Sequence, residues 1–365
     1  MTLSKKSPQP RPGILEIQPY VGGKAKAKGA NRAIRLASNE NPLGASSAAI
    51  EAFRAAANSL HRYPDGGATQ LREAIGAAEG LPVDRLVCGA GSDELIQLLV
   101  RGYAGPGDEV LYSQHGFLVY PLAAMAAGAR PVAATEHSLT ADVDALLAAV
   151  SARTRMVFLA NPNNPTGSYL GRQAVARLRN GLPEDVLLVL DAAYAEYVEE
   201  ADYDAGAELV AAHENVAMLR TFSKIHGLAA LRLGWVYGPK AAIDVLNRIR
   251  GPFNVTAPAQ AAGLAAIGDS DHVARSVASN AAQLARFREA VLTLGLEAPP
   301  SVGNFQLVRF PDPAKTAKAA KARLAGEGVL VRGMTSYGLP DCLRITIGLE
   351  EDMDSVIEGL RGFLA

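Results

Sequence analysis

The sequence predicts an α/β protein in which a large, mostly parallel β-sheet lies between helices and is joined to a smaller α+β domain. Length is the first observation, because 365 residues exceed what one simple core usually contains. Composition is the second, since 49% hydrophobic and 20% charged residues are typical of a folded globular protein. The third is an alternation of short β-rich runs with helical stretches from about residue 84 onwards, the pattern of a parallel sheet covered by helices.

A large domain is expected over residues 45–255, and it contains seven strand candidates. Each candidate is a short run rich in Val, Leu and Ala, too short for a helix of ordinary length. The expected strands cover residues 85–89, 109–113, 130–134, 156–160, 186–190, 216–221 and 233–237. Stretches rich in Ala, Leu and Arg lie between these runs and favour helices. The expected helices cover residues 93–103, 120–127, 142–150 and 172–180.

The pattern changes after residue 240, and residues 256–365 are expected to form the smaller α+β domain. A long helical region extends to residue 296. Two strand-like segments follow, FQLVRF at 305–310 and CLRITIG at 342–348, with a helix near 314–326 between them. Residues 1–44 have no core of their own, so we expect them to pack as an arm on this domain or on another subunit.

Charge and composition exclude several classes of partner. With 36 basic and 37 acidic residues the net charge is −1, so no global field attracts nucleic acid or an anionic membrane. No stretch approaches the roughly 18 apolar residues that span a bilayer, and no secretory signal is expected. The isolated Cys88 and Cys342 are typical of reduced thiols in the cytoplasm, and no metal-ligand spacing is present. Small molecules are therefore the expected partners.

Lys224 is the first candidate for chemistry. Most lysines are solvated surface charges. Lys224, however, follows the apolar strand VAMLRTF and precedes a Gly-led apolar segment, GLAAL, which places its amine at a strand end. Open α/β sheets hold their ligands at that edge. Partial desolvation there would lower the pKa of the amine and leave a nucleophile suited to a Schiff base.

Asp191 is the second candidate, because it ends the apolar strand VLLVL. A carboxylate at that depth is unfavourable unless a cation pairs with it, and a protonated pyridine nitrogen would be such a cation. A helix N-cap or a structural ion pair is the alternative interpretation. Tyr194 follows three residues later, near enough to aim its hydroxyl at the same ring.

Two turns supply further polar groups. NPNNPTG at residues 161–167 follows a third strand, and Asn164 within it has an amide that suits a ring oxygen; an ordinary turn is the alternative. GAGSDELIQLL at 89–99 is a glycine turn that opens a helix, with free backbone N–H groups that favour a phosphate. A capping box with Ser92 or Asp93 as the cap is the alternative there.

Taken together, these motifs resemble those of a known family. Asp191 of DAAY lies twenty-seven residues after Asn164, and Arg232 lies eight residues after Lys224 in TFSKIHGLAALRLGW. This combination resembles the fold-type-I, class I/II aminotransferases, which use pyridoxal 5'-phosphate (PLP). LASNENPLG at 36–44, HRYPDGG at 61–67, GAGSDE and CLRITIG resemble the histidinol-phosphate aminotransferase family most closely. The resemblance covers about residues 14–360.

At the ring of the cofactor, the resemblance implies five roles. Lys224 would bind PLP as a Schiff base and move a proton between the substrate α-carbon and the cofactor. Asp191 would keep the pyridine nitrogen protonated. Asn164 and Tyr194 would hydrogen-bond the phenolic oxygen of the ring. Phe117 would stack on the ring, at a position where the family often has tyrosine.

The resemblance also implies how the phosphate and the substrate are held. The cofactor phosphate would rest on the backbone at Ser92 and Asp93, with Ser223 and Arg232 completing the site. Tyr63 resembles a tyrosine that reaches this phosphate from the neighbouring subunit, which implies a homodimer with shared active sites. At the substrate end the resemblance implies an anionic anchor and two further contacts, which would come from Arg344, Tyr20 and Asn39.

The family's second position in DEAY is often Glu and its GLAGLR has Gly, whereas this chain has Ala192 and Ala230. Neither departure removes an atom from the implied chemistry. That chemistry is transfer of an amino group from L-histidinol phosphate to 2-oxoglutarate, as amino donor and 2-oxo acid.

Two alternatives stay open, and two others are disfavoured. An aminotransferase for aromatic or other amino acids, or a PLP lyase such as a phosphothreonine decarboxylase, would keep the same lysine, aspartate and arginine. A silent PLP-fold binding module is disfavoured, because it would not need a Schiff-base lysine. A nicotinamide-binding domain lacks support, since GAGSDE has only the first two glycines of GxGxxG.

Overall fold

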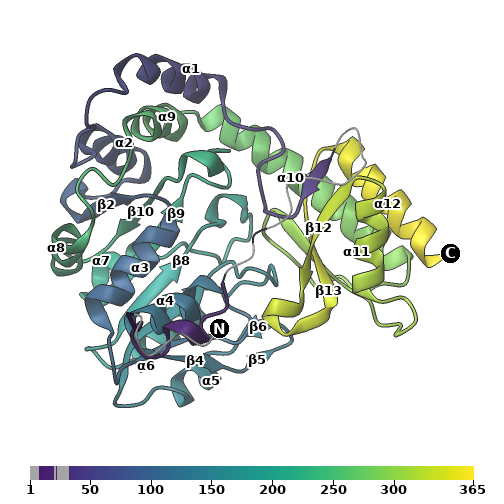
Figure 1. The fold of residues 1–365 in the computed structure, drawn as a ribbon, viewed down its shortest axis with the longest axis horizontal. Helices are drawn as coiled ribbons and strands as arrows, with labels where there is room; N and C mark the ends of the chain where they lie inside the picture. Colours follow the sequence, from purple (N-terminus) through teal and green to yellow (C-terminus); the bar gives the residue numbers. More distant parts are fainter. Residues whose placement is uncertain (1–7, 20–21, 23–32) are drawn as a thin grey trace.

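The computed structural model describes residues 8–19, 22 and 33–365, and it has two main β-sheets side by side (Figure 1). The larger sheet has seven strands, as the sequence predicts, and five neighbouring strands in it run parallel. The last strand in sequence pairs antiparallel with both of its neighbours. In spatial order the strands are β2 (Leu86–Gly89), β10 (Gly234–Tyr237), β9 (Val216–Thr221), β8 (Leu187–Asp191), β7 (Thr154–Ala160), β3 (Glu109–Ser113) and β4 (Arg130–Ala134).

Both faces of this sheet are covered by helices, which explains why its central strands are apolar throughout. Along β8, Leu187 and Val189 point to one hydrophobic core, whereas Leu188 and Leu190 point to the other, as the two-residue period of a strand requires. One core includes α3 (Ser92–Tyr103), α4 (Val119–Ala127) and α8 (Lys240–Ile249). The other includes α2 (Thr69–Glu79), α5 (Val143–Ala148), α6 (Arg172–Gly181), α7 (Ala207–Ala212) and α9 (Ala257–Ile267).

The smaller sheet has four strands, in the order β1 (Ile34–Leu36), β12 (Val329–Met334), β13 (Leu339–Thr346) and β11 (Phe305–Arg309). Its core is closed by α10 (Ser270–Thr293), α11 (Ala317–Gly326) and α12 (Glu350–Leu364). β11 and β13 fall within the two strand-like segments of the sequence or overlap them, whereas β12 was not predicted. β1 belongs to the expected arm, pairs parallel with β12 and contributes Leu36 to this core.

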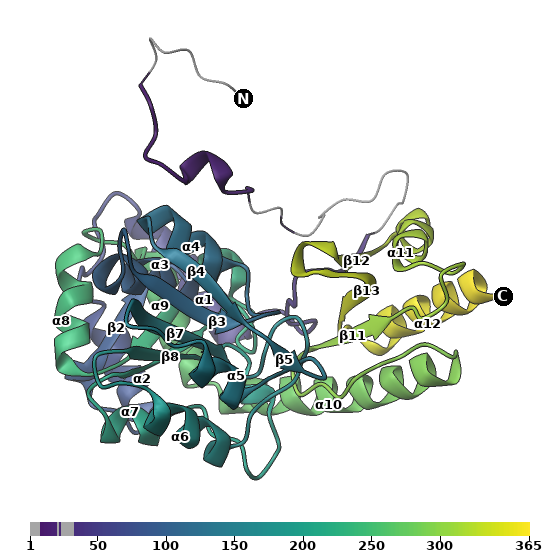
Figure 2. The same cartoon turned by 90° about the horizontal axis from the view of Figure 1, so that it is seen from below.

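The long helical region expected after residue 240 is divided into α8, α9 and α10. Pro258 occupies the first turn of α9, and Gly268 and the Asp269 cap separate α9 from α10. α9 packs on α1 (Ser47–Ala56) and α2, although it follows the expected domain boundary at residue 255. The division of the chain at residues 44 and 255 stays a prediction. α10 contacts β11 and α12 beside the smaller sheet and also the short helix η4 (Ala195–Tyr197), which follows β8 of the larger sheet. Figure 2 shows α10 from below.

Short elements complete the described parts of the chain. They are the hairpin strands β5 (Glu136–His137) and β6 (Thr140–Ala141) and the 3-10 helices η1 (Ile14–Glu16), η2 (Ala57–Ser59), η3 (Val83–Arg85), η4 (Ala195–Tyr197), η5 (Ala229–Leu231) and η6 (Thr335–Tyr337). In the described ranges, no helix combines the length and the apolar character that crossing a bilayer requires.

Candidate active site

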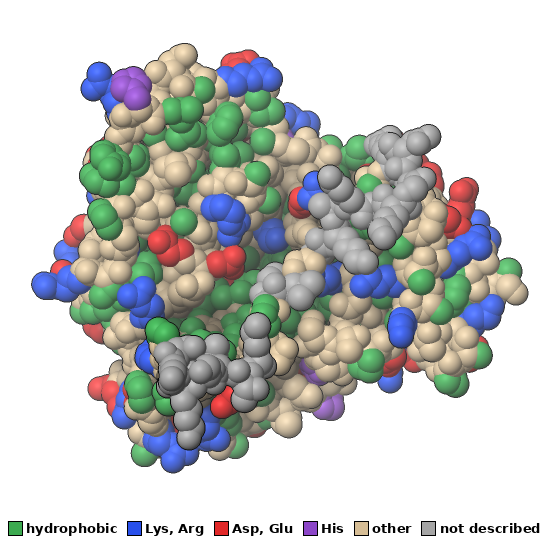
Figure 3. Space-filling model, in the orientation of Figure 1, with side chains coloured by type: hydrophobic (Ala, Val, Ile, Leu, Met, Phe, Trp, Pro, Cys, Tyr) green, Lys and Arg blue, Asp and Glu red, His purple; other side chains and the backbone are tan. Residues whose placement is uncertain are grey.

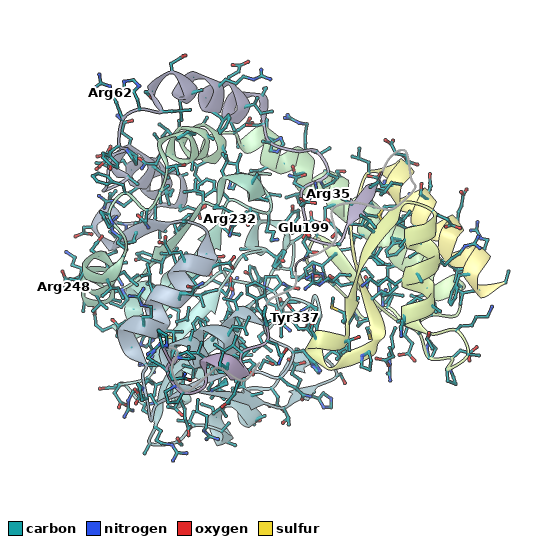
Figure 4. All side chains as sticks on the ribbon, in the orientation of Figure 1. Arg35, Arg62, Glu199, Arg232, Arg248 and Tyr337 are labelled. Atoms are coloured by element: carbon teal, nitrogen blue, oxygen red, sulfur yellow. The ribbon has the colours of Figure 1, made fainter. Side chains whose placement is uncertain are left out.

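A cavity of about 270 Å³ opens where β7, β8 and β9 end, between the two sheets. Parallel strands place their carboxyl ends at one edge, so the residues that follow them meet there. Basic and acidic side chains gather near the middle of the face in Figure 3, and Figure 4 places Arg232 in the same region. The predicted site residues that line the cavity are Asn39, Ser92, Asp93, Phe117, Asn164, Asp191, Tyr194, Ser223, Lys224, Arg232 and Arg344.

Asp191 ends β8 and is 5% exposed. The Tyr120 hydroxyl donates to its Oδ2 over 2.6 Å, whereas its Oδ1 is buried without a hydrogen-bond partner in the described part of the chain. Burial raises the pKa of Asp191 to about 6, and the bond from Tyr120 opposes this rise. A buried carboxylate oxygen without a donor is unfavourable, so a cationic N–H in the cavity would be stabilising at this position.

Lys224 lies in the turn that follows β9. The turn is closed by a bond from the Ser223 N–H to the Thr221 hydroxyl at 3.1 Å and by one from the Gly227 N–H to the Lys224 carbonyl at 3.0 Å. The Lys224 amine donates to the carbonyl of Ser38 at 3.2 Å and lies 5.6 Å from the centre of the Tyr194 ring. The ends of β8 and β9 thus bring the phenol of Tyr194 and the amine of Lys224 together.

Tyr194 is buried beside Asn39, whose side-chain amide donates to the phenol oxygen at 2.9 Å. Burial raises the pKa of Tyr194 to about 12, and the charge of Arg344 and the bond from Asn39 oppose this rise. The phenol therefore keeps its proton at neutral pH and remains a hydrogen-bond donor. Asn39 itself has φ 57° and exchanges hydrogen bonds with the hydroxyl of Thr346, which fixes the arm against β13.

Arg344 comes from β13 and enters the cavity from the side of the smaller sheet. It donates to the side-chain oxygen of Asn164 and, at 2.8 Å, to the carbonyl of Ala37. Its guanidinium carbon lies 5.5 Å from the centre of the Phe305 ring. The bond to Asn164 engages the oxygen of that amide, so the amide nitrogen is the end that can donate to a ligand, as the sequence argument requires.

The opposite end of the cavity is built around the N-terminus of α3. Gly91 has φ 81°, and a Cβ there would lie 2.5 Å from Nη2 of Arg232, so only glycine allows this close approach. The same guanidinium donates to Asp93 at 3.0 Å and to the Ser223 hydroxyl at 3.3 Å. The backbone of Arg232 has φ 52°, a left-handed value that is uncommon for residues other than glycine. Free N–H groups and a nearby arginine make this end suited to a phosphate.

The start of α3 is not a capping box with Ser92 or Asp93 as the cap. Gly91 is the N-cap of α3 and makes no side-chain cap bond, so neither Ser92 nor Asp93 is the cap. Glu94 instead accepts from the N–H of Ala90 at 2.6 Å. This arrangement leaves the side chains of Ser92 and Asp93 to line the cavity.

One predicted residue lies elsewhere, and another is not described. Tyr63 is 83% exposed and stacks on Phe253 with ring centres 4.7 Å apart, and it does not line the cavity. Tyr20 lies outside the described residues. The role of Tyr63 across a subunit interface stays a prediction.

The cavity also contains residues that the sequence argument missed. Tyr120 lies in the apolar segment VYPLAAMAA, where nothing distinguishes it from a core residue. Arg332 belongs to the unpredicted strand β12. Ser38 flanks Asn39 in LASNENPLG, so that motif was the signal that could have found it. Further lining residues that were not singled out include Glu40, Pro162 and Thr221.

Comparisons with known proteins identify a family and several similar proteins. The family model described as "Aminotransferase class I and II" matches residues 31–360. Histidinol-phosphate aminotransferase of Rhodospirillum centenum is 58% identical over 98% of this chain and 99% of its own length. The enzyme of that name from Paramagnetospirillum magneticum is 56% identical, with the same coverage.

A solved structure agrees in fold. The crystal structure of histidinol-phosphate aminotransferase from Sinorhizobium meliloti in complex with pyridoxal-5'-phosphate matches with a TM-score of 0.91 at 29% identity, covering 99% of both chains. The expected fold class, a PLP-dependent transferase of fold type I, is therefore confirmed.

Proposed function

Because the chain belongs to the class I and II aminotransferase family, we propose that it transfers the amino group of L-histidinol phosphate to 2-oxoglutarate in histidine biosynthesis. The protein is a PLP-dependent aminotransferase. The choice of amino donor is carried by one observation, the identity of 52–58% over 98% of the chain to relatives named histidinol-phosphate aminotransferase. The geometry of the cavity supports the roles of individual residues.

The residues of the cavity fit PLP at both of its polar ends. The buried Oδ1 of Asp191, without a donor in the described chain, suits a protonated pyridine nitrogen. At the other end, the start of α3 and the guanidinium of Arg232 suit a phosphate. When bound, PLP supplies an electron sink for the negative charge that develops at the substrate α-carbon.

Five residues would hold the ring. Lys224 would attach the cofactor covalently through its amine, and Asp191 would keep a negative charge beside the ring nitrogen. The amide nitrogen of Asn164 and the hydroxyl of Tyr194 would donate to the phenolic oxygen. Phe117 would cover one face of the ring and exclude water from it.

Five further residues would hold the phosphate. The backbone N–H groups of Ser92 and Asp93 would donate at the start of α3, where the helix dipole favours an anion. The hydroxyl of Ser223 and the guanidinium of Arg232 would complete the site within one chain. The hydroxyl of Tyr63 would reach it from the second subunit.

Lys224 would also act as the acid and base of the reaction. Its amine would take the proton from the substrate α-carbon and would then donate a proton to the cofactor. The hydrogen bond to the Ser38 carbonyl and the nearby Tyr194 ring keep the amine at the strand end, where it faces the cavity. A proton acceptor held at a fixed position is what such a transfer requires.

Arg344 would anchor the distal anionic group of each substrate. The two substrates enter the same cavity in alternate half-reactions, and a planar guanidinium can bind a phosphate in one and a carboxylate in the other. Its position beside Asn164 and Asn39 puts this charge at the substrate end of the cavity. Asn39 and Tyr20 would line the same end.

A panel of amino donors tests the choice of substrate. The acceptor is 2-oxoglutarate in every assay, and the donors are histidinol phosphate, phenylalanine, tyrosine, aspartate and phosphothreonine. Histidinol phosphate should have the highest kcat/KM. Arg344→Ala should lower kcat/KM for histidinol phosphate by a factor that corresponds to about 2 to 4 kcal/mol of lost transition-state stabilisation, because a charge-assisted contact is lost. Arg309→Ala is the matched control, because Arg309 on the adjacent strand β11 pairs with exposed carboxylates outside the cavity.

The panel separates the alternatives as well. A higher kcat/KM for phenylalanine or tyrosine would replace the proposed donor while retaining the aminotransferase chemistry. Release of carbon dioxide from phosphothreonine would favour a lyase instead. An Arg344→Ala variant as active as the parent would remove Arg344 from the substrate site.

The proposed assembly is a homodimer with two shared active sites. The exposed ring of Tyr63 supports it, as do Ile50 and Phe53 of α1 and Leu264 of α9, which are each about two fifths exposed on two helices that pack together. Figure 3 shows hydrophobic side chains gathered over this part of the surface. Apolar surface of this kind is typical of protein interfaces.

The proposed location is the cytoplasm. Cys88 and Cys342 are both free and buried, which supports a compartment in which thiols stay reduced.

Ultracentrifugation at assay concentration tests the proposed homodimer, and a fully active monomer would contradict it.

A further inference from the structure

We propose that Tyr120 is a positioning residue for the reaction: its hydroxyl fixes the Asp191 carboxylate so that the second oxygen, Oδ1, remains for the ring nitrogen of the cofactor. The inference rests on the proposed function, because Tyr120 acts only through Asp191. It concerns a residue that the sequence argument treated as part of a helix and nothing more.

The two oxygens of Asp191 are not equivalent. Oδ2 accepts from the Tyr120 hydroxyl over 2.6 Å, a short distance typical of a bond to a charged acceptor. Oδ1 has no donor in the described chain, although it is equally removed from water. One oxygen is therefore committed to the protein and the other is left for a ligand in the cavity.

Tyr120 is held rigidly by its neighbours. The side chain is 0% exposed, and its ring stacks on Phe158 of β7 with centres 4.5 Å apart and planes 5° from parallel. Its edge meets the ring of Phe117 at 5.9 Å and 88°. Rotation of the ring would break both contacts, so the direction of the hydroxyl is fixed by packing. The same residue thus contacts both the proposed cover of the cofactor and its proposed counter-ion.

The bond also affects the charge of Asp191. Burial raises the pKa of this carboxyl to about 6, and the charge of Asp93 raises it further. The Tyr120 bond lowers it, as do the backbone N–H of Ala193 and the charge of Lys224. Burial and the adjacent carboxylate hold the pKa of Tyr120 well above its usual value, so its hydroxyl remains a donor at every pH of interest. Without this donor, Asp191 would protonate at higher pH and lose its attraction for a cationic ring.

The test uses the apoenzyme and pyridoxamine 5'-phosphate, a probe with no aldehyde to react with Lys224. Its Kd is measured calorimetrically from pH 5 to 9. In the parent, affinity should weaken as the pH falls through about 6, where Asp191 takes up a proton. Tyr120→Phe should weaken binding about 10-fold near pH 7 and move the onset of weakening up by about one pH unit.

Tyr112→Phe is the matched control. Tyr112 lies on β3, and its ring meets the edge of the Tyr120 ring with centres 6.5 Å apart. The hydrogen bond to Asp191 comes from Tyr120 and not from Tyr112. Removing its hydroxyl should leave the Kd and its pH profile unchanged. A Tyr120→Phe profile that matches the parent and this control would overturn the inference.

A double-mutant cycle separates action through Asp191 from packing. In an Asp191→Asn background, adding Tyr120→Phe should change the Kd less than about 2-fold, because the charge it stabilises is gone. The same 10-fold loss in both backgrounds would overturn the positioning role. If Tyr120→Phe alone does not fold, the Tyr120→Phe/Asp191→Asn double variant should fold, because it has no buried carboxylate that needs the hydroxyl. Failure of both variants to fold would equally overturn the positioning role.

The proposed function has its own outcome in this design. A parent apoenzyme that does not bind the probe, or an Asp191→Asn variant that binds as the parent does at every pH, would refute the role of Asp191 and the inference with it. Additive losses would refute the inference alone.

Discussion

The two ends of the cavity differ in how far they are removed from water. At the ring end Asn164, Asp191 and Tyr194 are buried and are held by other side chains of the same chain. At the phosphate end the side chains of Arg232 and Asp93 are 47% and 43% exposed. The electrostatic interaction of a charged group is stronger where water is excluded and weaker where water and salt screen it. Changes at the ring end should therefore have large, salt-independent effects, and those at the phosphate end smaller, salt-dependent ones.

The largest effect is expected at Lys224. Lys224→Ala removes both the covalent attachment and the proposed proton carrier, so turnover should fall on the order of 10³-fold or more while the fold is retained. Borohydride reduction of the parent should fix the cofactor to the peptide that contains Lys224, as mass mapping would show. Lys240→Ala is the control, because Lys240 is an exposed lysine paired with Asp84. A label on any other lysine would contradict the assignment.

Asp191→Asn should separate catalysis from stability. A neutral amide cannot balance a cationic ring nitrogen, so kcat should fall on the order of 10²-fold, with the loss in the proton-transfer step. The substrate α-deuterium isotope effect measures that step. An unchanged isotope effect together with an unchanged kcat would contradict the proposed role.

The same substitution should stabilise the apoenzyme. Burial raises the pKa of Asp191 from its ordinary 3.8 to about 6, so the folded state binds this proton more tightly than the unfolded state does. The free energy of unfolding therefore falls by on the order of 3 kcal/mol as the pH rises from about 4 to 6, and it stays lower above that range. Asp191→Asn should recover this amount at pH 7.5 and little near pH 4.

Urea unfolding of the apoenzyme at the two pH values measures the difference. Asp185→Asn provides the control, since that carboxylate is 75% exposed and should show no comparable gain. Equal stability of parent and Asp191→Asn at pH 7.5 would mean that the buried carboxylate is not strained in the absence of its partner.

Residues that follow strands could be predicted from the sequence, whereas a residue that acts through tertiary packing could not. Asn164, Asp191 and Lys224 each follow a strand of the larger sheet, so strand patterns and short motifs were enough to bring them to one edge. Tyr120 could not be found in this way. It lies in an apolar helix 71 residues from its partner, and only tertiary packing turns its hydroxyl towards Asp191.

Two further gaps have physical causes. β12 was missed because Arg332 and Gly333 interrupt its apolar run, and its place in the sheet depends on pairing with distant strands. The break between α8 and α9 was missed although Gly251 and Pro252 lie in it, and this pair of helix-breaking residues was the signal that could have found it. Tyr63 presents a different problem, since its proposed partner is another molecule and no pattern within one chain positions it.

At the phosphate end, Arg232→Ala should raise the Kd for PLP about 10- to 100-fold, because charge-assisted hydrogen bonds are lost. The affinity of the parent should weaken with added salt, and that of the variant should depend on salt less. Fluorescence titration of the apoenzyme measures both. Arg248→Ala is the control, because Arg248 pairs with Asp244 on the far side of α3 from the cavity, where Figure 4 labels it. Equal salt dependence in parent and Arg232→Ala would argue against a half-exposed phosphate site.

The smallest effect is expected at Tyr63, whose hydroxyl would contribute one hydrogen bond across the proposed interface. Tyr63→Phe keeps the ring that stacks on Phe253, so the dimer should persist while the Kd for PLP rises about 3- to 10-fold. Mixed dimers make the test specific. A subunit with Tyr63→Phe and a partner with Lys224→Ala together form one site with both native residues and one with neither. Half of the sites should then bind PLP with the affinity of the parent. If Tyr63 acted within its own chain, the only sites with Lys224 would lack the Tyr63 hydroxyl, and no site of native affinity would appear.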